Sequence, residues 1–595
     1  MVESIAKIGK LVRGGGSQAG KGFTEKLEEL IMNIYGKDNK NKQYLLKIVL
    51  KKDNDNSYKF VGVDIEDLKE DSCLKSLYRS AGGNAINPSP TAQQKTDKDT
   101  FGNKILKFFE RASSEENDSK DLFKSIYDAL NKEESNIRSQ IEEKAKEKAT
   151  YLITITLIEN EKELYLLDKD EFVNYFLNQV EAKESRFSGY GICSICGKKG
   201  EVYGGVFPYA FFNLDKEGFL NKFDKKYSYK NFPICKDCIR DLEEGKKFIE
   251  NKLQYTFVKG LRYRIIPQNI TQDEESFGEL IDILKRQDKA ISVKNLMRIT
   301  DDEDEILYNL AEKDDTFTLN FLFIEKSNKA EKILALIQDV LPSRLRKIFD
   351  AKKKVDDTFK EVLEYEHNFS FGTIRQFFFK SDSNKKETDL DKYFLDLTDK
   401  IFKGRRIEKD FLFYYLMKGI REEFVKLGTK EREIFKFKSI DALTVYYFLS
   451  VLRLIDIKEV SMEERKFDVF FSKFGNALED PLKKGLILLG AATQTLLEVQ
   501  QDKRGSKPFL KYLKSLKMDE KDFKELLPKV QAKLEEYESL PYAKDFLEEA
   551  SYYLLQAGDK FKMNVSEMNF YFTVGMNLKW EILKSLNKEV KNERN

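Results

Sequence analysis

Histidine is almost missing from this 595-residue sequence, which contains only His367. Metal-dependent phosphohydrolases of the His-Asp type need several histidines, zinc hydrolases usually need two or three, and a Ser-His-Asp triad needs one beside a suitable serine. His367 stands in the run Glu-Tyr-Glu-His-Asn, without such a setting. We therefore expect a solvated or hydrogen-bonded structural histidine. No spaced carboxylate motif stands out either, so the sequence predicts a protein that is not an enzyme.

Long apolar runs and a strong net charge are missing as well. The longest apolar candidate, residues 485–492, is far shorter than the roughly 18 residues of a membrane span. Residues 1–10 lack the apolar core of a secretion signal, so we expect a cytoplasmic protein without a membrane partner. The net charge is only +2, so any contact with nucleic acid has to come from local basic patches.

Cysteine is scarce, but four of the five cysteines form two Cys-x-x-Cys pairs, Cys193 with Cys196 and Cys235 with Cys238. This spacing lets two thiolates of one tight turn converge on a single ion. The pattern predicts one structural Zn²⁺ with four sulfur ligands at about 2.3 Å. Gly197 favours this interpretation because a glycine after the second cysteine permits a sharp turn. An iron–sulfur cluster and, in an oxidising compartment, disulfides are the alternatives.

Between the two pairs lies a long segment that is both basic and aromatic. Its cations alternate with Phe223, Tyr227 and Tyr229, an arrangement suited to phosphates and bases of a nucleic acid. The candidate phosphate contacts are Lys222, Lys225, Lys226 and Lys230. A merely solvated lysine face is the alternative.

The part before the cysteines reads as mixed α+β. Residues 44–50 and 58–65 predict two strands, and residues 151–159 with 163–167 predict a hairpin. One charged helix is expected between them, with Phe123, Ile126, Leu130, Ile137 and Ile141 on one face. Residues 77–91 are rich in turn formers and amides, which predicts either a shaped loop whose amides reach base edges or sugars, or an ordinary surface loop.

The central part mixes a strand, helices and two basic clusters. Residues 316–324 predict a strand, and Ile333, Leu336, Ile337 and Val340 recur as on a helix that Pro342 kinks or restarts. The first basic cluster contains Arg344, Arg346 and Lys347, and the second contains Lys403, Arg405 and Arg406. In the second cluster, arginine forks suit a phosphate contact, although ion pairing at a domain interface is an equal alternative.

From about residue 462 the sequence is almost purely helical and predicts a bundle of four or five helices. One segment of it contains basic residues without any acid between them, which predicts a salt-sensitive grip on phosphates or, alternatively, a solvated helix. These residues are Lys503, Arg504, Lys507, Lys511, Lys514 and Lys517.

The predicted fold class is therefore α+β with several domains. A mixed α/β amino-terminal part is interrupted by a zinc-binding insertion and followed by a helical bundle. The expected boundaries are 1–185 for the amino-terminal domain, 186–250 for the zinc-binding subdomain, 251–461 for a mainly helical central region and 462–595 for the bundle.

Taken in order, these segments resemble a known family. The chain is similar to the large subunit of the type I-B CRISPR interference complex, Cascade. The segments that carry this similarity are residues 1–10, the 77–91 loop, the paired cysteines, residues 341–349 and 401–407, Leu-Leu-Gly at 488–490 and Phe-Tyr-Phe at 570–572. Each motif is weak individually, and their order along the whole chain carries the resemblance.

The resemblance implies a non-enzymatic subunit of an RNA-guided DNA surveillance complex. Guide pairing reads the target, while the protein reads a short adjacent motif on duplex DNA. The implied partners are a guide RNA, target DNA, a backbone repeat subunit, a subunit at the guide's 5′ handle, a small subunit and a recruited helicase-nuclease. The candidates for contacting the motif duplex are Asn84, Asn87, Gln93 and Gln94.

The resemblance also implies that the helical tail can be made separately from an internal start. Met462 precedes the bundle, and residues 458–460, Lys-Glu-Val, can be encoded by a ribosome-binding sequence. Chance is the alternative, because this tripeptide is common.

Two other functions compete with the Cascade hypothesis: a stand-alone zinc-ribbon protein that binds nucleic acid, and a carboxylate-dependent nuclease.

Overall fold

The computed structural model describes most of the chain. The residues outside the description are 14–26, 29, 37–41, 54–56, 82–84, 95–98, 147–148, 186, 210–213, 215, 259, 271–274, 276, 279, 282–306, 308–309, 328–329, 383–384, 387, 428–431, 457–464 and 593–595. Asn84, Met462 and residues 458–460 thus lie outside the described residues.

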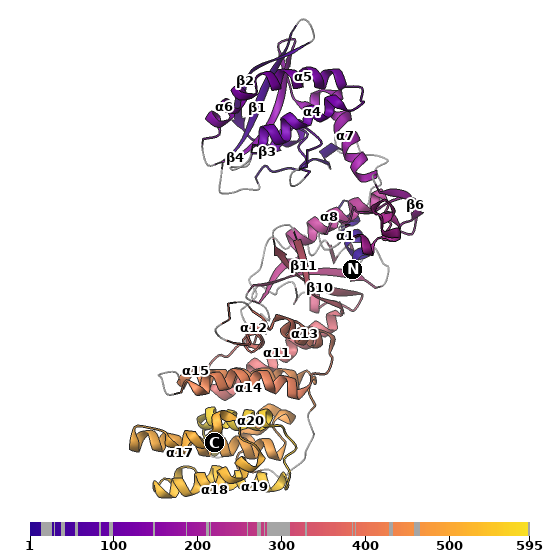
Figure 1. The fold of residues 1–595 in the computed structure, drawn as a ribbon. Helices are drawn as coiled ribbons and strands as arrows, with labels where there is room; N and C mark the ends of the chain where they lie inside the picture. The colour runs from indigo at the N-terminus through magenta and orange to yellow at the C-terminus, as the bar shows by residue number, and fades with distance from the viewer. Residues whose placement is uncertain are drawn as a thin grey trace. The chain divides into compact units, whose positions relative to one another are not determined.

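The chain divides into two compact units, residues 13–208 with 212–240, and residues 1–12 and 209–211 with 241–595. Each unit contains both strands and helices, and the helices predominate toward the carboxy terminus (Figure 1). The α+β class predicted from the sequence is confirmed. The four domain boundaries expected from the sequence remain predictions.

The amino-terminal sheet is built around one parallel pair of strands. In spatial order its strands are β2 (Tyr58–Asp67), β1 (Gln43–Lys52), β4 (Thr150–Glu159) and β3 (Ala92–Gln93), with β5 (Lys162–Leu164) paired to β4. β1 runs antiparallel to β2 and parallel to β4. The two predicted strands and the predicted hairpin are confirmed. β1 is buried on both faces, as its nearly continuous apolar run requires.

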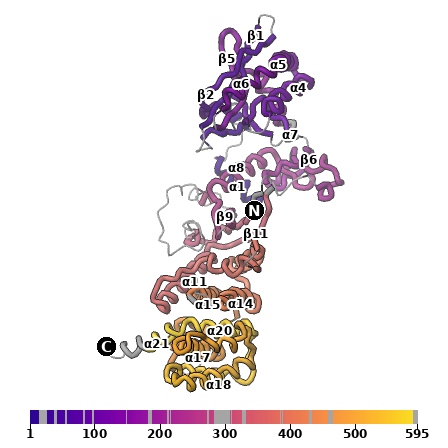
Figure 2. The backbone as a smooth tube through the Cα atoms, turned by 60° about the vertical axis from the view of Figure 1, so that its left-hand side comes forward, coloured from indigo at the N-terminus to yellow at the C-terminus, as the bar shows by residue number. Residues whose placement is uncertain are grey.

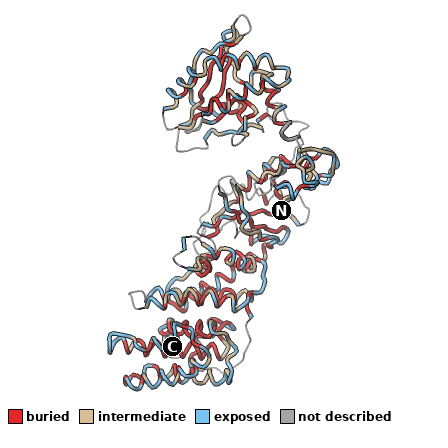
Figure 3. Tube along the Cα trace, in the orientation of Figure 1, coloured by how far each residue is buried: buried red, intermediate tan, exposed pale blue. Residues whose placement is uncertain are grey.

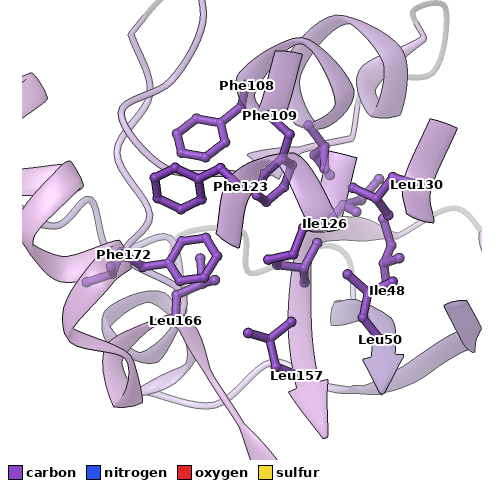
Figure 4. Close-up of a cluster of buried hydrophobic side chains, with 14 of the residues drawn as sticks. Ile48, Leu50, Phe108, Phe109, Phe123, Ile126, Leu130, Leu157, Leu166 and Phe172 are labelled. Atoms are coloured by element: carbon purple, nitrogen blue, oxygen red, sulfur yellow. The ribbon is translucent and has the colours of Figure 1, made fainter. Parts of the chain in front are cut away.

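Helices pack over one face of this sheet and bury an aromatic cluster. They include α4 (Lys107–Ser114), α5 (Lys120–Lys132), α6 (Glu134–Lys144) and α7 (Asp170–Ser185). Phe108, Phe109 and Phe123 gather with Phe172 beside the aliphatic side chains of the strands (Figure 4). The predicted apolar stripe is buried, but it is shared between α5 and α6, because the backbone leaves helical geometry at Glu133.

The cysteine-containing insertion is small and has few regular elements. They are β6 (Ser188–Ile192), β7 (Lys199–Tyr203), the short turns η4 (Glu217–Phe219), η5 (Asn221–Phe223) and η6 (Lys225–Lys230), and α8 (Lys236–Lys252). β6 and β7 form a two-stranded antiparallel hairpin. A hairpin of this size is marginally stable by itself and needs additional support.

The second sheet is antiparallel throughout. In spatial order its strands are β11 (Ala330–Val340), β10 (Phe317–Ser327), β9 (Leu261–Asn269) and β8 (Gln254–Val258). The predicted strand at 316–324 is confirmed as β10, whereas the helix predicted through Ile333 and Val340 is wrong. Ile337 pairs with Phe321 and Val340 pairs with Leu319, so between these pairs two residues of β11 oppose one of β10. This bulge puts apolar residues three apart on one face and imitates helical spacing.

Helix α1 (Val2–Val12) packs against the part of α8 that belongs to the same unit, through two glycines. A Cβ atom on Gly9 would lie 1.8 Å from the carbonyl oxygen of Asp241, and one on Gly245 would lie 2.0 Å from that of Ile5. The two backbones therefore cross in contact, which only glycine permits at these positions.

Helices follow the second sheet along the rest of the chain (Figure 2). The first group consists of α11 (Pro342–Leu363), α12 (Phe371–Arg375), α13 (Asp391–Lys403), α14 (Lys409–Val425) and α15 (Arg432–Val451). α11 begins at Pro342, so the predicted restart is confirmed. The second group consists of α16 (Asp468–Phe471), α17 (Pro481–Arg504), α18 (Glu520–Glu536), α19 (Lys544–Gln556), α20 (Val565–Asn577) and α21 (Lys579–Asn592).

α20 lies at the centre of the helical region and packs against α14, α15 and α17. Its residues from 567 to 576 are all buried, as the buried colour of this region shows (Figure 3). A Cβ atom on Gly575 would lie 1.7 Å from the carbonyl oxygen of Ile487, and one on Gly490 would lie 2.0 Å from that of Phe572. α17 and α20 thus cross with their backbones in contact.

Among the helices that the structure describes, none combines the length and apolarity that a membrane span requires.

Candidate metal centre and basic surfaces

The first cysteine pair lies in the turn between β6 and β7. Cys193 directly follows β6, and its N–H donates to the carbonyl of Lys198 at 2.9 Å. The N–H of Gly197 donates back to the carbonyl of Cys193 at 2.9 Å. Gly197 has a φ of 71°, which favours glycine. The turn predicted from Gly197 is confirmed, and it holds the Cys193 and Cys196 sulfurs near each other.

The second pair lies where the chain enters α8. Cys235 stands directly before the helix and Cys238 in its first turn. The N–H of Tyr203, at the end of β7, donates to the carbonyl of Ile234 at 2.9 Å, so the segment before α8 runs along the hairpin. This contact brings the second pair beside the first.

The four sulfur atoms all lie within 4.8 Å of one another, and those of Cys196 and Cys235 are 3.7 Å apart. In a tetrahedral site with metal–sulfur bonds of about 2.3 Å, neighbouring sulfurs are about 3.8 Å apart. All four thiols are free, so no disulfide joins them. The geometry therefore fits a single tetrahedral ion, and the cluster can hold a metal.

The thiols differ in how readily they ionise. Burial opposes ionisation of Cys193, but the backbone N–H groups of Cys196, Cys235 and Ile195 stabilise its thiolate and lower its pKa to about 7. Burial raises the pKa of Cys235 to about 11 and raises that of Cys238 still further. A second thiolate in this small space would be repelled by the first. A thiophilic cation removes that repulsion, so the donor set suits such an ion.

The lysines predicted to contact nucleic acid, Lys222, Lys225, Lys226 and Lys230, lie on the insertion between the cysteine pairs. Three of their ammonium groups surround the ring of Tyr227, at 4.8, 5.1 and 5.6 Å from its centroid for Lys222, Lys226 and Lys230. Of the four, only Lys226 forms an ion pair with a described residue, Asp224 at 3.1 Å. The result is a positive cluster around a single ring.

Two phenylalanines on the same insertion face solvent. Phe219 is 79% exposed and Phe223 is 72% exposed. Asn231 fixes their loop by accepting from the N–H of Asn221 at 2.8 Å and donating to the carbonyl of Phe219 at 2.6 Å. Lys222 and Phe223 both have positive φ, a strained conformation for residues other than glycine. The sequence interpretation included Phe223 but missed Phe219, for which the turn-forming neighbour Gly218 was the available signal.

The first central basic cluster is largely bonded within the protein. Arg344 donates through Nε to the carbonyl of Ile401 at 3.0 Å, and burial lowers its pKa. Arg346 donates through Nε to the carbonyl of Ala311 at 3.0 Å. Lys347 is exposed. The two guanidinium groups thus support the fold, and Arg346 and Lys347 are the exposed residues of this cluster.

The second central basic cluster is ion-paired within the protein, with two carboxylates for its three cations. Lys403 lies 2.9 Å from Asp399, Arg405 forms an ion pair with the same carboxylate, and Arg406 forms one with Asp456. All three cations remain partly exposed at their side chains. Of the two roles considered from the sequence, ion pairing is the one that these contacts serve.

The basic segment of the tail lies at the end of α17 and along η9 (Pro508–Leu516). Its predicted residues are Lys503, Arg504, Lys507, Lys511, Lys514 and Lys517. Acids of α18 approach two of them, with Glu536 at 3.9 Å from Arg504 and Asp522 at 2.5 Å from Lys514. The described residues offer no ion-pair partner to Lys511 or Lys517, and both are exposed. Positive charge is therefore left at the second half of the segment.

The amide side chains considered for duplex contact have different surroundings. Asn87 is 2% exposed, donates to the carbonyl of Thr91 at 2.7 Å and accepts from the N–H of Ala81 at 3.0 Å. It therefore shapes its own loop. Gln93 is exposed in β3, and Gln94 beside it is half-buried.

His367 lies between helices α11 and α15. Its Nε2 is 3.1 Å from the hydroxyl of Thr444 and 3.3 Å from a carboxylate oxygen of Asp441. Burial lowers the pKa of His367, which favours the neutral ring. Thr444 is fully buried and donates to the carbonyl of Ile440 at 2.8 Å. The histidine is hydrogen-bonded inside the fold, as predicted.

Three family models match the chain in consecutive order. They describe the amino-terminal, central and carboxy-terminal domains of CRISPR-associated protein TM1802, and they match residues 1–178, 190–340 and 369–589. Together the matches leave only short stretches of the sequence uncovered. The central match contains all four clustered cysteines. A comparison with curated proteins gives no match.

Proposed function

The chain belongs to the CRISPR-associated protein TM1802 family, and on this premise we propose that it is the large, non-catalytic subunit of a type I-B Cascade complex. In such a complex the guide RNA pairs with the target strand, and the protein reads a short adjacent motif on the duplex. The observation that carries the proposal is the match of three consecutive family domains along nearly the whole chain. The hydrogen-bonded, half-buried state of the single histidine agrees with it.

In this proposal the metal centre is a structural zinc site. Four sulfur ligands complete the tetrahedron of Zn²⁺ and leave no position for a reacting water. The binding free energy of about 10–16 kcal/mol seen in small zinc peptides then acts as folding energy. It would hold together an insertion whose described residues form one short hairpin, three short turns and the start of α8.

The cations without an ion-pair partner among the described residues are the proposed contacts to nucleic acid. Lys222, Lys225 and Lys230 form no ion pair with any described residue, and Lys511 and Lys517 share that property. Unpaired ammonium groups release the counterions of phosphates, which gives a sequence-independent and salt-dependent attraction. Among the amides, the exposed Gln93 is the one we assign to the motif duplex, since Asn87 is engaged within its loop.

A separately made tail starting at Met462 also belongs to this proposal. Such a tail would lack α14, whose Phe413 ring lies 5.0 Å from that of Phe570 in α20. The face of α20 that α14 and α15 cover in the full chain would then need another apolar partner. A small subunit of this kind is therefore expected in association with other subunits of the complex.

Reconstitution tests the proposed function. Complexes assembled with and without the chain are mixed with a library of duplexes that contain the guide-matched target flanked by randomised sequence. We expect a few flanking sequences to be enriched only when the chain is present. Equal binding without the chain would contradict the proposal. Magnesium-dependent cleavage by the purified chain, abolished on substitution of a carboxylate, would instead support the nuclease alternative.

A further inference from the structure

A cavity of about 1130 Å³ lies beside the second sheet, and its lining includes neither a cysteine nor a residue predicted to contact nucleic acid. Its described lining residues come from three places. These are the β8–β9 turn, the parts of β10 and β11 around the paired residues Glu325 and Lys332, and the segment from α12 to α13. The volume reaches the upper end of the roughly 300–1,000 Å³ typical of ligand pockets. The cavity therefore has room for a ligand at least as large as a mononucleotide.

Among the described residues, each acid that lines the cavity is paired with a neighbouring cation. Glu325 lies 3.9 Å from Lys332, and Asp391 forms an ion pair with the buried Arg375. Asp389 lies 2.5 Å from the ammonium of Lys385. The carboxylates around the cavity thus contribute little free negative charge.

Three cations at the same cavity have no such partner. Arg262 lies in β9 and is exposed, and Lys386 and Lys392 are exposed in the segment before and within α13. Among the described residues, no carboxylate lies within ion-pair distance of any of the three. The described lining residues therefore carry a net positive charge that an anionic ligand can neutralise.

Apolar surface completes the lining. Leu322, from β10, and Leu395, from α13, are buried, and Phe379 adds a half-buried ring. The guanidinium of Arg375 lies 5.2 Å from the centroid of the Phe379 ring and supports it from one side. A flat aromatic ligand group can pack on such a wall, while a phosphate contacts the cations.

We propose that this cavity is a nucleotide site, which takes a nucleotide phosphate through Arg262, Lys386 and Lys392 and a base against Phe379. The same chemistry is offered by the end of an RNA strand and by a free nucleotide. The inference goes beyond the proposed role in interference, because none of the residues assigned to that role lines the cavity. It also stands if that role fails, since it depends on the cavity alone.

The test uses the full-length chain with its metal and a fluorescent RNA trinucleotide, pApApA, measured by anisotropy. The double variant Lys386→Glu with Lys392→Glu should weaken binding of the probe. Each of the two lysines that contacts a phosphate should account for a factor of about ten or more. Lys386→Arg with Lys392→Arg should retain binding, because charge and donors are kept. Lys521→Glu, at a lysine whose side chain is 84% exposed on α18, is the matched control and should bind as the unsubstituted chain does.

Competitors distinguish the two sources of the ligand. Displacement by AMP at concentrations similar to that of pApApA supports a site for free nucleotides, and displacement by RNA strands alone supports a site for a strand end. If inorganic phosphate or an acidic peptide displaces the probe as effectively as AMP does, the nucleotide assignment is overturned. Unchanged affinity in the Lys386→Glu, Lys392→Glu variant, with an unchanged melting temperature, would overturn the site itself.

Discussion

Zinc affinity is expected to rise steeply with pH, because cysteine binds zinc as a thiolate and two of the four thiols resist ionisation. Burial raises the pKa of Cys235 to about 11 and that of Cys238 further. Cys193, stabilised by backbone N–H groups against the effect of its burial, has a pKa of about 7. Above pH 7 it is therefore mostly ionised before the metal binds. Zinc binding in mildly alkaline solution then displaces at least two protons, one from Cys235 and one from Cys238.

The magnitude follows from proton linkage. Each displaced proton changes the logarithm of the affinity by one per pH unit, so the protons of Cys235 and Cys238 tighten binding at least about 100-fold between about pH 7.5 and pH 8.5. This corresponds to about 2.7 kcal/mol. Below pH 7, Cys193 contributes a further proton and the dependence becomes steeper still. The sign is fixed, because raising the pH lowers the cost of forming every thiolate.

Competition with a chromophoric zinc chelator over this pH range measures the dependence, after correction for the chelator's own protonation. Calorimetry in two buffers of different ionisation enthalpy counts the released protons independently. The variant Cys73→Ser is the control, since Cys73 lies in another cluster of buried residues, and it should leave the slope unchanged. A gain of tenfold or less over the same pH interval would refute the reasoning, because Cys235 and Cys238 could not then both lose a proton on binding.

Three further predictions concern the metal, the helix crossing and the lysine surface. Cys235→Ser should abolish zinc binding and the hydrogen-exchange protection of residues 188–203; retained protection would show that the metal is dispensable. Gly575→Ala should cost about 1–3 kcal/mol of unfolding free energy through overpacking, whereas Gly278→Ala, with no atom within 4 Å of the added methyl, should cost less than about 1 kcal/mol. Lys222→Glu with Lys230→Glu should reduce the salt slope of single-stranded RNA binding by about 1.4, and an unchanged slope would exclude both phosphate contacts.

The features that sequence alone predicted best depend on neighbours in the chain. The strands β1 and β2, the turn at Gly197 and the helix start at Pro342 all follow from local spacing and backbone geometry. The two cysteine pairs were predicted for the same reason. The sequence did not show how the two pairs come together, because their convergence depends on the contact between β7 and the segment before α8.

The features that sequence did not predict depend on residues that are distant along the chain. β11 is a strand because it pairs with β10, and its bulge disguises the period. The tail segment contains no acid, yet Asp522 and Glu536 approach it from α18. Tyr229 seemed a candidate for stacking on bases, but a Cβ atom on Gly189 would lie 2.3 Å from its ring, so the ring packs within the insertion. No local pattern reveals contacts of this kind.

Purification of the tagged chain from cells that carry its neighbouring genes, followed by mass spectrometry and RNA sequencing, tests the central claim most directly. We expect a backbone repeat subunit and short RNAs that share one 5′ handle to co-purify with the chain. Recovery of the chain without those RNAs and without other CRISPR-associated subunits would contradict its assignment as the large subunit of Cascade.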